Sequence, residues 1–208
     1  MTISYPRSLP SGMAIQRCVM RQNSNVAVAK SPFTGSEQVH AHQGQWWDAD
    51  ISVTPSEAAN ARPITAWFAS LNGREKTVLF GDPAAATARG SASTTPGTPL
   101  VNGASQTGGS LICDGGPNAA TGYLLEGDYI QVDTGSASRL HMVLEDVNTD
   151  GSGDFTATIW PNIRTSPTEN AAITVSSPKG VFRLTENMRS WDESTVIWGF
   201  SFGLTEVI

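Results

Sequence analysis

The sequence predicts a mainly β protein with one α-helix, in which a small β domain is inserted into a larger one. Segments that alternate apolar and polar residues, as half-buried strands do, follow one another along much of the 208 residues. One stretch, at about residues 55–71, has instead the period of a helix. A tract rich in small residues, 84–122, is too long for an ordinary connection, so it contains a functional loop or a linker into a second unit.

Two strands far apart in the sequence each have one apolar face. Their alternating apolar residues are Trp47, Ala49, Ile51 and Val53 in "QWWDADISV", and Val196, Trp198, Phe200, Phe202 and Leu204 near the end of the chain. We expect these two strands to lie side by side, so that the residues between them fold as a separate unit. Strands are expected near residues 13–20, 25–30, 45–53, 76–81, 128–133, 139–147, 154–160, 172–176, 181–185 and 195–207.

The expected helix has a clear start signal. Thr54 is placed to be the N-cap, Pro55 to be the first helical residue, and Glu57 to complete a capping box. Pro63 lies inside the stretch, so we expect it to kink the helix or to begin a second one.

The helix also has an apolar face that ends at a stop signal. Its members recur at i, i+3, i+4 and i+7 and are Ile64, Trp67, Phe68 and Leu71, and Asn72-Gly73 ends the run. A stripe of this period is typical of a helix that covers a sheet, and we prefer that interpretation to a ligand-binding stripe.

Charge and composition narrow the function classes. Charged residues make up 15% of the chain, against roughly 25% in ordinary domains, which suggests a surface covered in an assembly or, alternatively, a Ser/Thr-rich β surface. The net charge is −6 and the 13 Lys and Arg residues are scattered, which argues against specific nucleic-acid binding. No apolar run is long enough to span a membrane. Cys18 and Cys113 lack metal-site spacing and no signal peptide precedes them, so we expect cytoplasmic synthesis.

The stretch "DVNTDGSGD", residues 146–154, resembles a calcium loop but lacks its strongest ligand. Asp146, Asn148, Asp150 and Asp154 fall at ligand positions, whereas Ala157 stands where a bidentate Glu is needed. The flanking residues alternate as strands do, and not as helices. We therefore expect a turn between two strands, with a weak calcium site as the alternative.

The remaining candidates for chemistry are weak. His40 and His42 lie two apart, so one side of a strand could present both to a metal, but surface or interface imidazoles are the preferred interpretation. His141 is expected to be satisfied or solvated on the polar face of its strand. A glycosidase needs two carboxylates, and spacing selects no pair among Asp48, Asp50, Glu126, Asp128, Glu145 and Asp146. We assign no catalytic, cofactor-binding or metal-binding residue and expect no cofactor and no enzyme.

The run "LLEGDYIQVDTGSASRLHMVLEDVNTDGSGDFTATIWPNIR" resembles the inserted domain of distal tail proteins from long-tailed, non-contractile bacteriophages. "QWWDADISVTP" with the helix after it, and the final "GFSFGLTEVI", resemble the tube-like domain of that family, whose first and last segments pair. The resemblance covers nearly the whole chain in order and spacing.

The resemblance implies a fold and a role. It implies a tail-tube-like split β-barrel or sandwich from residues 1–88 completed by 187–208, with an OB-like β-barrel inserted at 89–186. It further implies a homo-hexameric ring at the virion tail tip, made in the host bacterial cytoplasm. That ring would join the tail tube protein above to the tail hub protein below, and DNA would pass through its lumen.

Two other classes of function stay open. A carbohydrate-binding module would need exposed aromatic residues, for which Trp46, Tyr129 and Trp160 are the candidates. A hydrolase is the weaker alternative, because no triad or carboxylate pair is marked by a motif.

Overall fold

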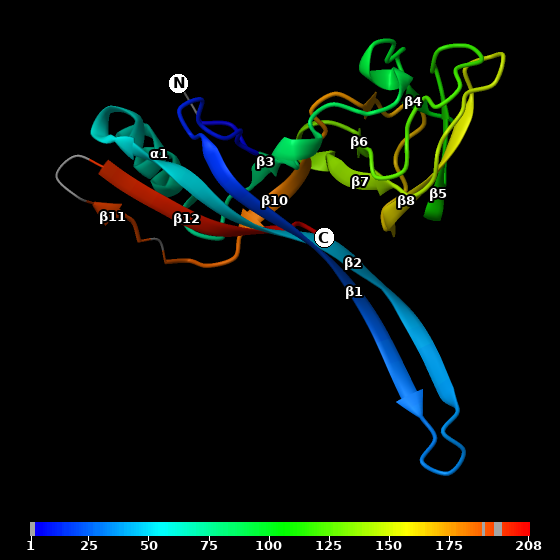
Figure 1. Cartoon of the computed structure of the whole chain (residues 1–208), viewed down its shortest axis with the longest axis horizontal. Helices are drawn as coiled ribbons and strands as arrows, with labels where there is room; N and C mark the ends of the chain where they lie inside the picture. Colours follow the sequence, from blue (N-terminus) through cyan, green and yellow to red (C-terminus); the bar gives the residue numbers. More distant parts are fainter. Residues whose placement is uncertain (1–2, 189, 194–196) are drawn as a thin grey trace.

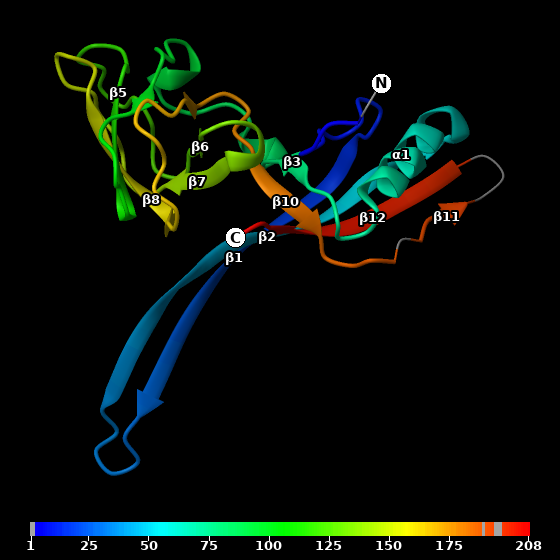
Figure 2. The ribbon, with the colours of Figure 1, turned by 180° about the vertical axis from the view of Figure 1, so that it is seen from behind.

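The computed structural model describes residues 3–188, 190–193 and 197–208, and it confirms the predicted fold class. The protein is mainly β with one α-helix, and its sheets form a nearly closed barrel and a sandwich. Two lobes, each built on one sheet, lie side by side, and a long hairpin projects away from both of them (Figures 1 and 2).

The first sheet has six strands in the order β1-β2-β12-β10-β3, with β11 paired to β12. Its strands are β1 (Ile15–Lys30), β2 (Glu37–Glu57), β3 (Val78–Phe80), β10 (Gly180–Leu184), β11 (Asp192–Glu193) and β12 (Ile197–Glu206). The hairpin in Figure 1 is the far part of β1 and β2, which run well beyond the rest of the sheet. The sequence predicted only parts of these two strands.

The early and the late strand are neighbours, as the sequence predicted. β12 lies between β2 and β10, and in its pairing with β2 Phe202 stands opposite Ile51 and Leu204 opposite Ala49. The expected apolar faces are buried, including Trp47 at 1% exposure and Phe200 at 5%, except that Trp198 is only half-buried. Val196, the first residue predicted for the late face, lies outside the described residues.

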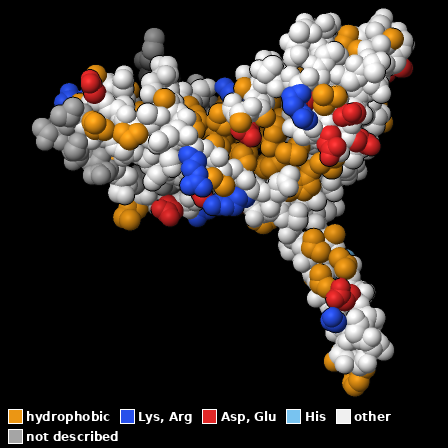
Figure 3. Space-filling view, in the orientation of Figure 1, with side chains coloured by type: hydrophobic (Ala, Val, Ile, Leu, Met, Phe, Trp, Pro, Cys, Tyr) orange, Lys and Arg blue, Asp and Glu red, His pale blue; other side chains and the backbone are white. Residues whose placement is uncertain are grey.

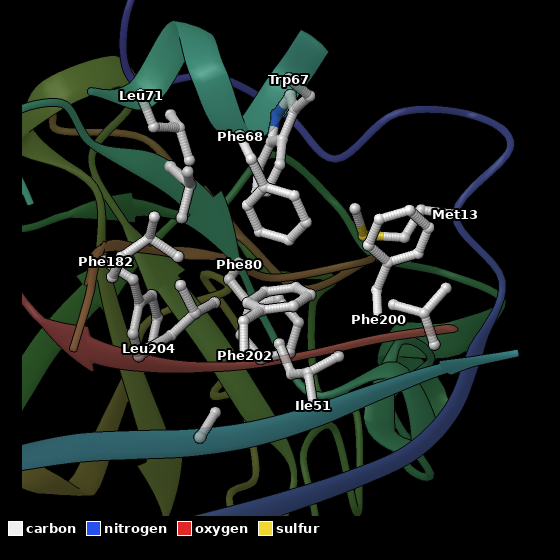
Figure 4. Close-up of a cluster of buried hydrophobic side chains, with 14 of the residues drawn as sticks. Met13, Ile51, Trp67, Phe68, Leu71, Phe80, Phe182, Phe200, Phe202 and Leu204 are labelled. Carbon is white, nitrogen blue, oxygen red and sulfur yellow. The ribbon is translucent and has the colours of Figure 1, made fainter. Parts of the chain in front are cut away.

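Helix α1 (Ala58–Leu71) covers one face of this sheet. Figure 4 shows Trp67, Phe68 and Leu71 reaching from the helix toward Phe202 and Ile51. The Phe68 and Phe202 rings meet edge to face with centroids 5.1 Å apart. The apolar stripe of the helix is therefore core, as expected. Pro63 lies inside one continuous helix and does not begin a second one.

The predicted capping box is wrong. β2 continues through residues 54–57, and the helix begins at Ala58 after Glu57, whose side chain makes no capping hydrogen bond. The reason is tertiary, because Ser56 and Glu57 pair with Trp198 and Ile197 of β12. Pro55 lies where the register between β2 and β12 shifts, and such an irregularity tolerates a residue without an N–H.

The second sheet also has six strands, in the order β4-β5-β8-β7-β6-β9. They are β4 (Leu100–Val101), β5 (Gly108–Asp114), β6 (Tyr129–Val132), β7 (Arg139–Val143), β8 (Phe155–Ile163) and β9 (Ile173–Thr174). Short 3₁₀ helices occur at Pro83–Ala85, Ser91–Ser93 and Gly135–Ala137. The tract 84–122 is thus more than a loop or linker, since it supplies β4 and β5.

The two sheets divide the chain slightly differently from the predicted domains. The second sheet lies wholly within residues 89–186, the range predicted for the inserted domain. β10 falls in the same range, but it pairs with β3 and β12. The pairing therefore assigns β10 to the first sheet, and not to the small barrel expected from the sequence.

Candidate functional site

The projecting hairpin is the most exposed element of the protein. We call residues 24–43 the arm, and every one of them except Ser31 is exposed. The hydrogen bonds and the Lys30–Glu37 ion pair described for this segment stay within the hairpin. Figure 3 shows apolar side chains along the arm and at its tip. The arm is thus a two-stranded ribbon that the rest of the chain does not cover.

The arm has two chemically different faces. On one face Val28 stands directly opposite Val39, and these side chains are 59% and 63% exposed. On the other face His40 stands opposite Ala27, and the rings of His40 and His42 lie 4.6 Å apart. The two histidines therefore share a face, as the spacing suggested. Among the described residues no group of three or more metal-ligating side chains occurs, so the structure adds no third ligand to this pair.

The two lobes meet at a seam centred on Trp47 of β2. Its indole nitrogen donates a hydrogen bond of 3.1 Å to the Leu140 carbonyl of β7. Its ring lies 5.5 Å from the Tyr129 ring and 4.5 Å, edge to face, from the Trp160 ring. Tyr129 and Trp160, two of the aromatic residues considered for glycan contact, are therefore used in packing. Trp46 is half-buried on the opposite face of β2.

A buried ion pair closes the seam beside Trp47. Arg164, in the segment after β8, has a guanidinium nitrogen 3.2 Å from a carboxylate oxygen of Glu206 on β12. The other Glu206 oxygen accepts a 3.2 Å hydrogen bond from the Trp47 backbone N–H. Burial raises the pKa of Glu206, and Arg164 opposes that rise. The sequence analysis did not single out either residue.

His141 is buried, which corrects the expectation of a polar strand face. β7 is covered on both sides, because Leu140 faces the first core while His141, at 6% exposure, lies on the opposite side. Its Nδ1 lies 2.7 Å from the Pro161 carbonyl, so Nδ1 carries the proton and donates. Burial lowers the pKa of His141 to about 4. The histidine is thus satisfied, as one of the two expected alternatives had it.

The loop 146–154 connects two strands, as predicted, and its oxygens make local bonds. Asp150 accepts hydrogen bonds from the backbone N–H groups of Ser152 and Asp154, at 2.8 and 2.9 Å. These bonds hold the pKa of Asp150 below its ordinary value. Asn148 accepts from the Gly122 N–H and Asp146 from the Glu126 N–H. The side chains of Asp146, Asn148 and Asp150, three of the residues that resemble calcium ligands, therefore fix the loop and its neighbours.

Two other carboxylates considered for a glycosidase pair also have structural partners. Asp128 is 3% exposed and accepts from the backbone N–H groups of Arg89, Gly90 and Leu125. Asp50 pairs with Arg21.

Both cysteine thiols are expected to be unreactive in the folded protein. Burial, helped by nearby Asp82 and Asp50, raises the pKa of Cys18 to about 11, and burial also raises the pKa of Cys113. Because the thiolate is the nucleophile, an aromatic disulfide reagent at pH 8 should label neither thiol within minutes in native buffer and both in denaturant. Cys113 is buried and Cys18 is half-buried, and rapid labelling of either thiol in the native protein would contradict this expectation.

No helix in the described ranges combines the length and apolarity needed to cross a bilayer.

Comparison with known proteins adds no relative. No model of a known protein family matches the sequence, and no curated protein is significantly similar to it.

Proposed function

We propose that the chain is a structural subunit of a ring. In this proposal it is the distal tail ring adaptor of a long-tailed bacteriophage, and six copies join the tail tube to the tail-tip hub around a lumen for DNA. The protein is then a virion component and not an enzyme. The observation that carries the proposal is the arm, a long ribbon that its own chain leaves uncovered.

The physics of the arm favours assembly. An isolated two-stranded hairpin is marginally stable in water, so an extended arm needs a partner to hold it. Its exposed apolar residues include Phe33 at the tip, which is 95% exposed. β1 is also an edge strand of the first sheet, and an unpaired edge is a template for pairing with another chain. A ring of identical copies would cover the arm and the edge together.

The charge of the chain fits a lumen that must not hold DNA. The net charge of −6 opposes the adhesion of phosphate backbones to a surface that DNA has to pass. The low charged fraction of 15% fits a protomer whose sides are buried between neighbours.

A double substitution on the valine face of the arm tests the assembly. We expect Val28→Ser with Val39→Ser to abolish or strongly weaken oligomerisation. The two valine side chains are exposed to water in the single chain, and a neighbouring copy would bury them, so their loss removes apolar contacts between copies. The matched control is Ala27→Ser with Ala29→Ser on the same strand, two smaller changes that should assemble as the unmodified chain does. Oligomer mass is measured by sedimentation, and circular dichroism checks that both variants are folded.

The placement in a tail is tested separately. Electron microscopy of assembled particles, with the chain labelled by an antibody, should show it in a ring at the tail tip. Its absence from tail tips would overturn the adaptor proposal even if the purified chain oligomerises.

The substitution experiment has its own contradicting outcome. If the Val28→Ser, Val39→Ser variant assembles as well as the control, the arm is not the contact between copies.

A further inference from the structure

A small cavity opens at one end of the second sheet. Its volume is about 250 Å³. Leu111, Val132 and Ile163 form its apolar floor, and all three are buried members of the core beneath that sheet. Its polar lining includes Asp133, Arg139 and His141 of β7, and the segment that follows β8. A concave site with an apolar floor and a few polar groups at the mouth of a β-structure is typical of a small-ligand site.

Two of the polar residues that line this cavity are already engaged elsewhere. The Arg164 guanidinium donates to the Gln45 carbonyl and pairs with Glu206 across the seam. His141 donates from Nδ1 to the Pro161 carbonyl, which leaves its other ring nitrogen as an acceptor when the ring is neutral. Neither residue therefore supplies a free charge to the cavity.

The other two charged residues of the cavity are not ion-paired. None of the ion pairs among the described residues includes Arg139 or Asp133. Arg139 donates one guanidinium hydrogen bond, of 3.0 Å, to the Ser138 carbonyl. Asp133 accepts one bond of 2.7 Å from the Thr134 N–H through a single carboxylate oxygen. One cation and one anion thus line the same apolar-floored cavity with hydrogen-bonding capacity unused.

We propose that this cavity binds a small α-amino acid in its zwitterionic form. Arg139 holds the carboxylate, because a guanidinium offers paired N–H donors that match a carboxylate. Asp133 accepts from the ammonium group, and an aliphatic side chain lies on the apolar floor. A cavity of about 250 Å³ has room for a ligand of this size.

Calorimetric titration of the whole chain with L-leucine tests the proposal. Saturable binding is expected, and it should weaken about tenfold or more for N-acetyl-L-leucine, which lacks the ammonium, and for L-leucinamide, which lacks the carboxylate. Arg139→Met keeps most of the apolar stem and should weaken leucine binding by a similar factor. Asp133→Asn should do the same, and Asn tolerates the positive φ of 67° at this position.

The matched control is Arg62→Ala, which removes an exposed guanidinium on α1 and should bind leucine as the unmodified chain does. Thermal unfolding of each variant shows whether it is folded. The proposal is overturned if leucine does not bind at millimolar concentrations. It is also overturned if the two analogues bind as well as leucine, or if the folded Arg139 and Asp133 variants keep full affinity.

Discussion

Replacing Trp47 by alanine is expected to lower the free energy of unfolding by about 3–5 kcal/mol, as for other buried aromatic residues. Trp47 is 1% exposed and is the residue on which both lobes meet. Its loss removes ring contacts with Tyr129 and Trp160 and leaves the Leu140 carbonyl without its indole partner. Urea unfolding followed by circular dichroism gives the free energy.

The neighbouring tryptophan provides the control. Trp46 points from the opposite face of β2 and is half-buried, so Trp46→Ala should cost clearly less than Trp47→Ala. Trp47→Phe should lie between the two, because it keeps an aromatic ring but loses the N–H donor. Equal costs for the two alanine variants would show that the seam does not depend on Trp47.

Arg164→Ala is expected to have a comparable effect, about 3–5 kcal/mol at neutral pH, because it leaves a buried carboxylate without its cation. The Glu206 side chain is 1% exposed and the Arg164 side chain 16%, so solvent screens this pair only weakly. Adding Glu206→Gln to the Arg164 variant should recover much of the loss, since the charge that needed compensation is then gone.

The pH dependence of this loss has a definite sign. Burial raises the folded-state pKa of Glu206 above its ordinary value of 4.5, and removing Arg164 raises it further. Below the unfolded pKa the carboxyl is neutral in both states, and stability falls as pH rises through the folded pKa. The cost of Arg164→Ala should therefore be largest at neutral pH and shrink toward pH 4. A cost independent of pH would contradict the buried pair, and a background that already contains Glu206→Gln should abolish the dependence.

The sequence predicted the core of the first sheet because its strands have one solvent-exposed face and one buried face. Trp47 and Phe202 recur with a period of two among their apolar neighbours, and this period is what burial on one side of a sheet imposes. Of the arm, the sequence predicted only one strand, near residues 25–30, and not its partner. Both faces of the arm are exposed, so residues 37–43 carry no stripe of large apolar residues from which a strand could be predicted.

Local signals failed where a distant strand competed with them. Thr54 and Glu57 have the spacing of a capping box, but β12 takes the backbone of this segment into the sheet. Of the seam, the sequence predicted that Trp47 is buried but not that it faces a second lobe. One signal for the ion pair was present in the sequence. Glu206 lies two residues after Leu204 and four after Phe202, so strand alternation places its carboxylate on the same apolar face.

The central position of β12 has a consequence for how the chain folds as it is made. β12 follows every other strand in the sequence, yet it separates β2 from β10 within the sheet. While the ribosome is still adding residues, the second sheet can close, but the first has a gap where β12 will fit. We infer that, until β12 is made, the facing edges of β2 and β10 lack hydrogen-bond partners. In this state chaperones have a natural role.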